Sequence, residues 1–276
     1  MSKPQNFIHK ATHQFLYAWR LAGVMFSTYY AYMLEYRAEL FIWVLSNSLP
    51  FILMGAWLKA AEAGGTSLTS LEFIRYFLAV FIVRQFNIVW VIWDFEKELI
   101  SGQLSHRLLQ PIAPFWHHFF GHIAERWARF PLLVGLIILF FVIYPQAFWI
   151  PSWSAGLLTT LTVAIAFSLR FLIQYVFGLL SFWTERASAI EQLWFLTYIF
   201  LSGIIAPLEL FPPLVRDLVM FTPFPYMVYF PAAILIGKTV NVWQGLGVMM
   251  GWMAIALVAK QWLWAKGIKH YSGMGA

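Results

Sequence analysis

Two arginines that lie inside long apolar stretches have the clearest potential for chemistry. Arg84 is followed three residues later by Asn87. Arg170 is followed four residues later by Gln174. Residues at these spacings share one face of a helix, so each arginine would have an amide side chain beside it. The pattern predicts a polar path that attracts an anionic substrate, such as a lipid-linked phosphate or an acidic head group.

The alternative for both arginines is a structural role. An ionisable side chain deep in an apolar layer costs at least about 2 to 3 kcal/mol, so it faces a cavity, binds a partner or reaches toward water. Hydrogen bonds to helix carbonyls, pairing with Glu191, or extension toward the membrane surface would each meet this requirement. Both interpretations stay open at the level of sequence.

Three histidines form the second group of candidates. His118 and His122 are four residues apart and could share a metal ion, with His117 beside them. No carboxylate completes a convincing ligand set, which favours the start of an interfacial helix over a metal site. The chain has no cysteine, and we find neither a nucleophile–base–acid grouping nor a glycine-rich lysine motif for phosphate. We therefore expect no catalytic residue, metal or cofactor in this chain.

The elements that position these residues must be membrane helices, because the composition excludes a soluble fold. The 276 residues are 61% hydrophobic and 11% charged, whereas soluble domains carry about 25% charged residues. The net charge of +6 is explained by membrane topology rather than by nucleic-acid binding. We expect an all-α polytopic membrane protein that forms one transmembrane domain over residues 1–276 and contacts membrane lipids.

Six apolar segments are candidates for membrane spans, each compared with the roughly 20 residues that a crossing requires. The fifth is short, and an earlier start of the third, near Phe115, is an alternative. The six predicted spans are Leu40–Leu58, Phe73–Trp93, Arg129–Tyr144, Ser154–Leu180, Gln192–Ala206 and Trp243–Trp264.

The distribution of lysine and arginine predicts the orientation of these spans. Of the 18 such residues, two (Arg84 and Arg170) lie deep inside spans, which leaves 16 in loops, in terminal segments or within a few residues of a span end. With both termini inside, 12 of the 16 fall on the inner side and four on the outer side. Because inner loops are enriched in lysine and arginine, both termini are predicted to be cytoplasmic.

Two segments outside the spans have patterns of their own. Residues 1–38 are predicted to form an amphipathic helix in the cytoplasmic interface, with an upstream part of the first span as the alternative. Residues 207–238 contain six of the 13 prolines yet stay apolar. Two short helices are predicted there, at 213–221 and 226–236, with Gly237 after the second. Such a segment between full spans predicts an outer re-entrant hairpin, which membrane depth tolerates only inside protein or along a cavity.

The loop over residues 94–114 is the most strongly patterned cytoplasmic segment. Acidic residues end the second span, and Gly102 permits a sharp change of chain direction. Leu104 and Leu108 follow at a spacing of four on one helix face, and Pro111 cannot continue the helix. This arrangement predicts a short amphipathic helix that docks against another protein. An ordinary interfacial turn is the alternative.

This loop resembles the coupling helix of permease subunits in type-2 ATP-binding cassette exporters. The matching residues are Glu96, Glu98, Ile100, Gly102, Leu104, Leu108, Leu109 and Pro111. The proline-rich segments at 211–214, 222–225 and 230–233 resemble the outer hairpin of the small six-span permeases. The amphipathic N-terminus and the order of the spans extend the resemblance to nearly the whole chain.

The resemblance implies the membrane permease of an ATP-driven exporter, which forms its translocation path with a second permease, identical or homologous. A separate ATP-binding cassette ATPase would bind ATP and magnesium. The residues that would couple the chain to this ATPase are Glu96, Glu98, Gly102, Leu104, Arg107, Leu108 and Pro111. The expected location is the cytoplasmic (inner) membrane of a bacterium.

Two other functions stay open. One is a membrane assembly subunit without transport activity. The other is a lipid-processing enzyme, which would need acidic residues or histidines that converge at one face of the membrane. The acidic residues of this chain lie mostly in loops at different heights, which disfavours the enzyme.

Overall fold

The computed structural model describes residues 4–271, with the backbone alone for residues 4–18, and the described chain is helical without strands. The long helices are α1 (Pro4–Glu35), α4 (Ser70–Asn87), α7 (Pro114–Ile143), α8 (Trp153–Leu179) and α13 (Val242–His270). The shorter ones are α2 (Arg37–Ser46), α3 (Leu49–Glu62), α5 (Val91–Ile100), α6 (Gln103–Leu108), α9 (Ser188–Leu201), α10 (Pro213–Val219), α11 (Phe224–Met227) and α12 (Tyr229–Leu235). Three 3-10 turns are η1 (Pro145–Ala147), η2 (Leu180–Phe182) and η3 (Leu208–Leu210).

Five helical segments of the described chain are long and apolar enough to cross a membrane. They are Arg37–Glu62, Ser70–Ile100, Pro114–Ile143, Trp153–Phe182 and Val242–His270. The predicted third span corresponds to α7, whose start agrees with the alternative near Phe115. The predicted fifth span corresponds to α9, which has 14 residues and is shorter than a full crossing requires. An all-helical, multi-pass membrane protein is thus confirmed, and the count of six spans stays a prediction.

The first two predicted spans are each divided into two helices. Asn47 and Ser48 separate α2 from α3, and Pro50 lies in the first turn of α3, where its missing N–H costs little. Residues 88–90 separate α4 from α5, and Ile88 has extended backbone angles. Apolar sequence concealed the second break, because apolar residues occupy helical and extended segments alike, whereas the polar run Ser46–Ser48 before Pro50 marks the first break in the sequence.

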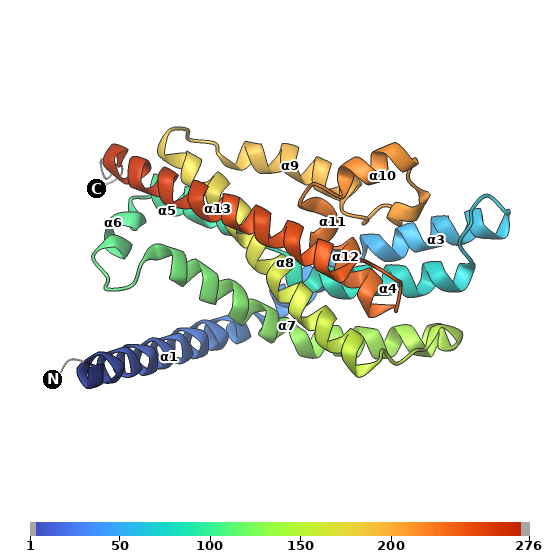
Figure 1. Ribbon diagram of the computed structural model, residues 1–276, viewed down its shortest axis with the longest axis horizontal. Helices are drawn as coiled ribbons and strands as arrows, with labels where there is room; N and C mark the ends of the chain where they lie inside the picture. The colour runs from blue at the N-terminus through green and yellow to red at the C-terminus, as the bar shows by residue number, and fades with distance from the viewer. Residues whose placement is uncertain (1–3, 272–276) are drawn as a thin grey trace.

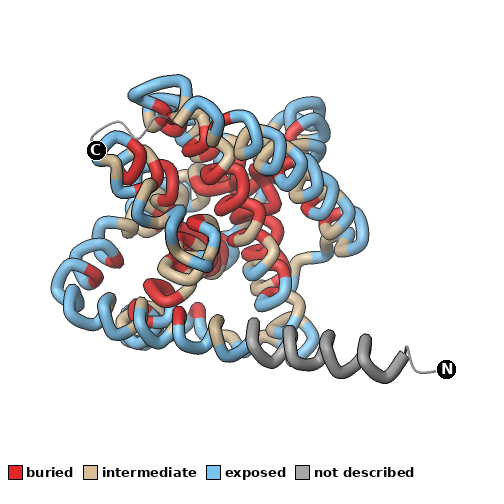
Figure 2. The backbone as a smooth tube through the Cα atoms, turned by 90° about the vertical axis from the view of Figure 1, so that its left-hand side faces the viewer, coloured by how far each residue is buried: buried red, intermediate tan, exposed pale blue. Residues whose placement is uncertain are grey.

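The helices run mostly along the long axis of the molecule (Figure 1). The chain termini, α6 and the connection from α8 to α9 lie at one end, on the left of that view. The connections from α3 to α4 and from α7 to α8 lie at the other end, together with α10. Seen from the first end, buried segments occupy the centre and exposed segments surround them (Figure 2).

The central segments differ sharply from the outer ones in burial. In the apolar part of α4–α5, 78% of residues are buried, compared with 17% in α13. The exposed apolar faces of α13, α7 and α2–α3 are the surfaces that a membrane would cover. Helix α1 packs along α7, and its predicted interfacial position stays a prediction.

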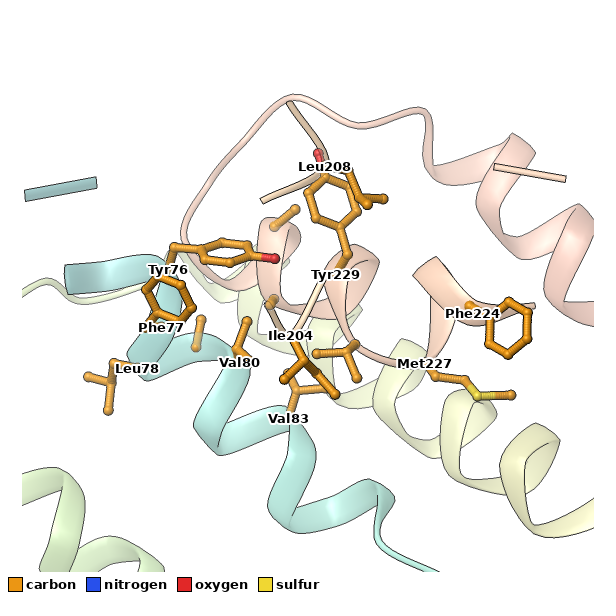
Figure 3. Close-up of a cluster of buried hydrophobic side chains, with 14 of the residues drawn as sticks. Tyr76, Phe77, Leu78, Val80, Val83, Ile204, Leu208, Phe224, Met227 and Tyr229 are labelled. Carbon is orange, nitrogen blue, oxygen red and sulfur yellow. The ribbon is translucent and has the colours of Figure 1, made fainter. Parts of the chain in front are cut away.

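The hairpin segment is packed into the core (Figure 3). Side chains of α4 such as Tyr76 and Val80 lie opposite Ile204, Met227 and Tyr229. The predicted second helix of this segment is in fact two, α11 and α12, because backbone angles change at Val228. Gly237 follows α12 with φ +77°, as the sequence predicts for a residue that ends a helix in the left-handed conformation. Its re-entrant, outer placement stays a prediction.

Candidate functional site

Helix α6 and the chain around it form the best-defined candidate site. Gly102 precedes the helix with φ +73°, a left-handed conformation that favours glycine because a Cβ would crowd the next carbonyl. The chain therefore turns sharply between α5 and α6. The helix ends at Leu108, before Pro111. Both features agree with the pattern in the sequence.

An ion pair fixes α6 to α5. Arg107 Nη2 lies 2.9 Å from Glu98 Oε1, and Arg107 Nε donates to the same oxygen at 3.0 Å. Glu98 is buried, so a missing partner would leave a desolvated carboxylate. Partial burial disfavours the charge on Arg107, but hydrogen bonds with Tyr29 and the nearby Glu98 raise its pKa above the ordinary value.

Two more helices join this ion pair through aromatic and imidazole groups. The Tyr29 hydroxyl of α1 lies 3.3 Å from Arg107 Nη1 and 2.9 Å from His117 Nδ1 of α7. His118 Nε2 of α7 lies 3.3 Å from Glu98 Oε2. The structure thus brings a carboxylate to the histidines, which the sequence did not show. In the described residues no group of three or more such side chains could hold a metal ion.

The C-terminal end of the described chain contacts the start of α6. The Tyr271 hydroxyl accepts a hydrogen bond from the Ser105 N–H at 3.2 Å and lies 2.8 Å from the Ser105 hydroxyl. It also lies 3.4 Å from the carbonyl oxygen of Gly102. The Ser105 N–H also donates to the Gly102 carbonyl at 3.1 Å, so the Tyr271 hydroxyl shares this donor and joins the C-terminal segment to the start of α6.

The two leucines of α6 and Leu109, which directly follows it, have different environments. Leu104 is fully buried against Phe95 and Leu99 in a hydrophobic cluster of this chain. Leu108 is 37% exposed and Leu109 is 86% exposed. The internal ion pair and the buried Leu104 therefore fix the position of α6, and the surface offered to a partner is formed by Leu108 and Leu109.

Glu96 joins α5 to the first residue of α9, Ser188. Its carboxylate accepts hydrogen bonds from the Ser188 N–H at 2.7 Å and from the Ser188 hydroxyl at 2.9 Å. An acidic group at a helix N-terminus satisfies free N–H groups and complements the helix dipole. Movement of α5 would therefore be transmitted to α9.

The break between α4 and α5 is held by α7. Arg126 donates to the carbonyl oxygens of Phe86 and Ile88, which have no helical partner there. His122 Nε2 accepts from the Trp90 N–H at 3.0 Å, and Glu125 accepts from the Trp90 indole at 3.2 Å. Because buried backbone groups need partners, these side chains make the break a stable part of the fold.

The two membrane arginines are buried and each has a protein partner. Arg84 Nη2 lies 3.3 Å from Asn47 Oδ1. Arg170 lies 4.0 Å from Glu191 and 4.0 Å over the ring of Tyr198. These contacts favour the structural interpretation of both arginines.

Their neighbouring amides also bind protein groups. Asn87 donates to the carbonyl oxygen of Met227 in the hairpin at 2.5 Å. Gln174 donates to Glu191 at 2.6 Å. The four residues therefore connect α4 and α8 to the turn after α2, to α9 and to α11. Gln174 and Arg170 share the carboxylate of Glu191.

Sequence reasoning missed several residues of this site. Tyr29, Ser188 and Tyr271 are far from residues 94–111 in the chain, and no local pattern distinguishes them. The signal that could have drawn attention to α7 was the run of polar residues at its start, which includes His118 and Arg126. A long apolar helix that begins with so many polar groups must satisfy them inside the protein.

A comparison with protein families gives one match that covers most of the chain. Residues 41–275 match a family described as ABC-2 family transporter protein. No curated protein matches the chain.

Proposed function

Because the chain belongs to the ABC-2 family of transporter proteins, we propose that it is the permease subunit of an ATP-driven exporter and that α6 couples it to the ATPase. The observation that carries the proposal is the construction of α6. The segment is fixed to three helices, α1, α5 and α7, and to the C-terminal segment, while Leu108 and Leu109 stay exposed at the end that also holds both termini. A surface loop without such a role needs neither feature.

The proposed mechanism uses α5 and α6 as one rigid element. ATP binding brings the two ATPase subunits together, and a groove on the ATPase carries Leu108 and Leu109 with it. The ion pair between Arg107 and Glu98 transmits that displacement to α5. The break at residues 88–90 separates α5 from the buried α4, so α5 can tilt while α4 stays packed. Such a shift requires that the ATPase contact differ between the two states.

The finer assignments follow from the same proposal. The ATPase partner holds ATP and magnesium, and this chain holds neither. A second permease, identical or homologous, completes the translocation path. Helix α9 with the hairpin of residues 207–238 completes a sixth crossing, and α6 and both termini face the cytoplasm of a bacterium across its inner membrane. The exposed apolar helices contact lipids.

Arg84, Asn87, Arg170 and Gln174 receive a structural role in this proposal. Their contacts with Asn47, Glu191 and the hairpin hold the central helices together, because a buried cation is stable only with such partners. Replacement of both arginines by glutamine would therefore lower the stability of the permease and its assembly. Loss of transport with normal stability and assembly would instead assign the arginines to the substrate path.

The test of the coupling role uses Leu109, the exposed leucine that directly follows α6. Leu109→Asp should abolish co-purification with the cognate ATPase and ATP-dependent export, because a carboxylate replaces an apolar contact. Leu214→Asp is the matched control, since Leu214 is 73% exposed at the opposite end. Normal ATPase binding and export by Leu109→Asp would contradict the coupling role of α6. Leu104→Asp is unsuitable because it would disrupt the core.

A further inference from the structure

A groove separate from α6 lies at the end of the molecule that holds the C-terminus. It has a volume of about 690 Å³ and is formed by η2 and the residues after it, the start of α9 and the last turns of α13. Phe182 of η2 packs against Gly267 of α13, where an added Cβ would lie 2.1 Å from the ring. This close approach fixes the two walls of the groove relative to each other.

One side of the groove is basic. Lys266, Lys269 and His270 all line it, and no aspartate or glutamate does. Glu191, the nearest acid on α9, is buried and hydrogen-bonded to Gln174. The residues that line the groove therefore carry two positive charges from lysine and no negative charge, whatever the protonation state of the histidine.

The rest of the lining is largely apolar and includes aromatic residues, in part from α13 itself. Leu180, Ile190 and Leu263 line the groove together with Trp183 and Trp262. Tryptophan is enriched where a membrane meets water, because its ring is apolar and its N–H is polar. Lys266 Nζ lies 4.0 Å over the ring of Trp262, so the ammonium group stays beside the apolar wall.

We propose that this groove binds an anionic phospholipid of the cytoplasmic leaflet, with its phosphate beside Lys266 and Lys269 and an acyl chain along the apolar wall. Three observations support one occupant of this chemistry. The groove combines positive charge with an apolar wall, it lies where a membrane-spanning helix ends, and its end of the molecule is the one predicted to face the cytoplasm. Basic pockets between membrane helices on that side suit anionic head groups. A soluble anion would leave the apolar wall uncovered.

The test measures lipid binding by the isolated full-length chain, so it does not depend on the ATPase or on transport. Native mass spectrometry of the protein in detergent, titrated with phosphatidylglycerol or phosphatidylcholine, gives an apparent dissociation constant for each lipid. We expect clear preference for phosphatidylglycerol. Each cation near an anionic head group strengthens binding by roughly fivefold, so Lys266→Gln with Lys269→Gln should weaken phosphatidylglycerol binding by roughly thirtyfold.

A matched control separates the groove from general attraction of lipid to a basic protein. Arg37→Gln with Lys97→Gln removes the same charge from exposed positions outside the groove, on the same predicted side. This variant should bind phosphatidylglycerol as the unaltered chain does. An equal loss in both double variants would overturn the proposal.

A second variant tests the apolar wall without changing charge. Thr184 lines the groove and is exposed, so Thr184→Trp should fill the groove without disturbing the core. It should weaken phosphatidylglycerol binding severalfold, while added glycerol 3-phosphate should not compete with the lipid. Equal binding of the two lipids by the unaltered chain would overturn the proposal, and so would competition by glycerol 3-phosphate. Loss of ATPase capture by a groove variant whose lipid binding is unchanged would also overturn it. The last outcome would identify a protein contact.

Discussion

Helix α6 and the hairpin helices α11 and α12 are all short segments between longer helices, yet they are held in opposite ways. Helix α6 lies at the end of the molecule that holds the termini, and α11 and α12 lie near its middle (Figure 1). Residues 223–234 of the hairpin are all buried. In α6, from Gln103 to Leu108, Leu104 is the buried residue and the others are partly or fully exposed. The hairpin is fixed by apolar packing, and α6 is fixed by an ion pair and hydrogen bonds.

The difference indicates which of the two segments, α6 or the hairpin, can change its position. Apolar packing stabilises in proportion to the volume that it fills, so a shift of the hairpin would open cavities along α4 and α8. Hydrogen bonds and partly exposed ion pairs contribute less each, and water or a partner can replace them. We infer that the hairpin is a fixed reference and that a partner can displace α6 together with α5, once the contacts of α6 with α1, α7 and Tyr271 are replaced.

The largest expected effect tests the hairpin, which is the fixed segment. Phe230 is 1% exposed and packs on Gly245 of α13, where an added Cβ would lie 2.2 Å from the ring. Phe230→Ala should lower the free energy of unfolding by about 3 to 5 kcal/mol, because it leaves a cavity. The measurement is thermal unfolding of the purified chain in detergent. Phe221→Ala is the control, since Phe221 is 69% exposed; equal losses would show that the hairpin is not fixed by packing.

The next effect tests α6, which is the movable segment. Glu98→Gln should lower the free energy of unfolding by about 2 kcal/mol and should release α6, which protease cleavage between residues 101 and 113 would report. Arg107→Gln should cost more, because it leaves the buried Glu98 carboxylate without its guanidinium partner, whereas water can solvate the 27% exposed Arg107 side chain when Glu98 is replaced.

The double variant decides whether the two residues act as a pair. Glu98→Gln with Arg107→Gln should cost less than the sum of the two single changes by about 1 kcal/mol. Strict additivity would mean that the ion pair does not hold α6.

Local rules predicted the limits of the short helices from the sequence, but they missed the contacts that join distant segments. Gly102 and Pro111 set the limits of α6 by backbone geometry, and Gly237 did the same for α12, so these positions were predictable. The partner of Glu98 was nine residues away and still unforeseen, because an exposed docking surface explained the same charges. Tyr29 and Tyr271 could not be found, since their roles depend on how α1 and α13 pack.

The break within the second span was missed for a related reason, whereas the break within the first span had a signal in the polar run Ser46–Ser48 before Pro50. Hydropathy is the same for a helix and for an extended apolar residue such as Ile88, so the pattern indicates depth in the membrane but not backbone conformation. Arg126 was the available sign, because a charged residue inside a predicted helix needs buried acceptors. Its acceptors are the carbonyl groups that the break exposes.

A smaller effect separates stability from coupling. Gly102→Ala should cost about 1 kcal/mol, because alanine is strained at φ +73°. Gly64→Ala is the matched control, since Gly64 has the same φ in the connection from α3 to α4, with open space for a Cβ. Both variants should unfold at similar temperatures. Gly102→Ala alone should lower the export achieved per ATP hydrolysed, and equal export by both would argue against a special role for the turn.

The smallest effect tests the contact between the C-terminal segment and α6. Tyr271→Phe removes the hydroxyl that meets Ser105 but keeps the ring, which packs against Phe182. The expected cost is roughly 0.5 to 1 kcal/mol, the usual contribution of one partly buried hydrogen bond. Because so small a change is hard to resolve by unfolding, hydrogen exchange at the Ser105 amide is the sharper measurement, and it should accelerate severalfold. Ser105→Ala keeps the amide contact and should leave that exchange rate nearly unchanged. If Tyr271→Phe exchanged no faster than the unaltered chain, α6 would be held by the Glu98 pair and Leu104 alone, and the C-terminal segment would be free to move independently of it.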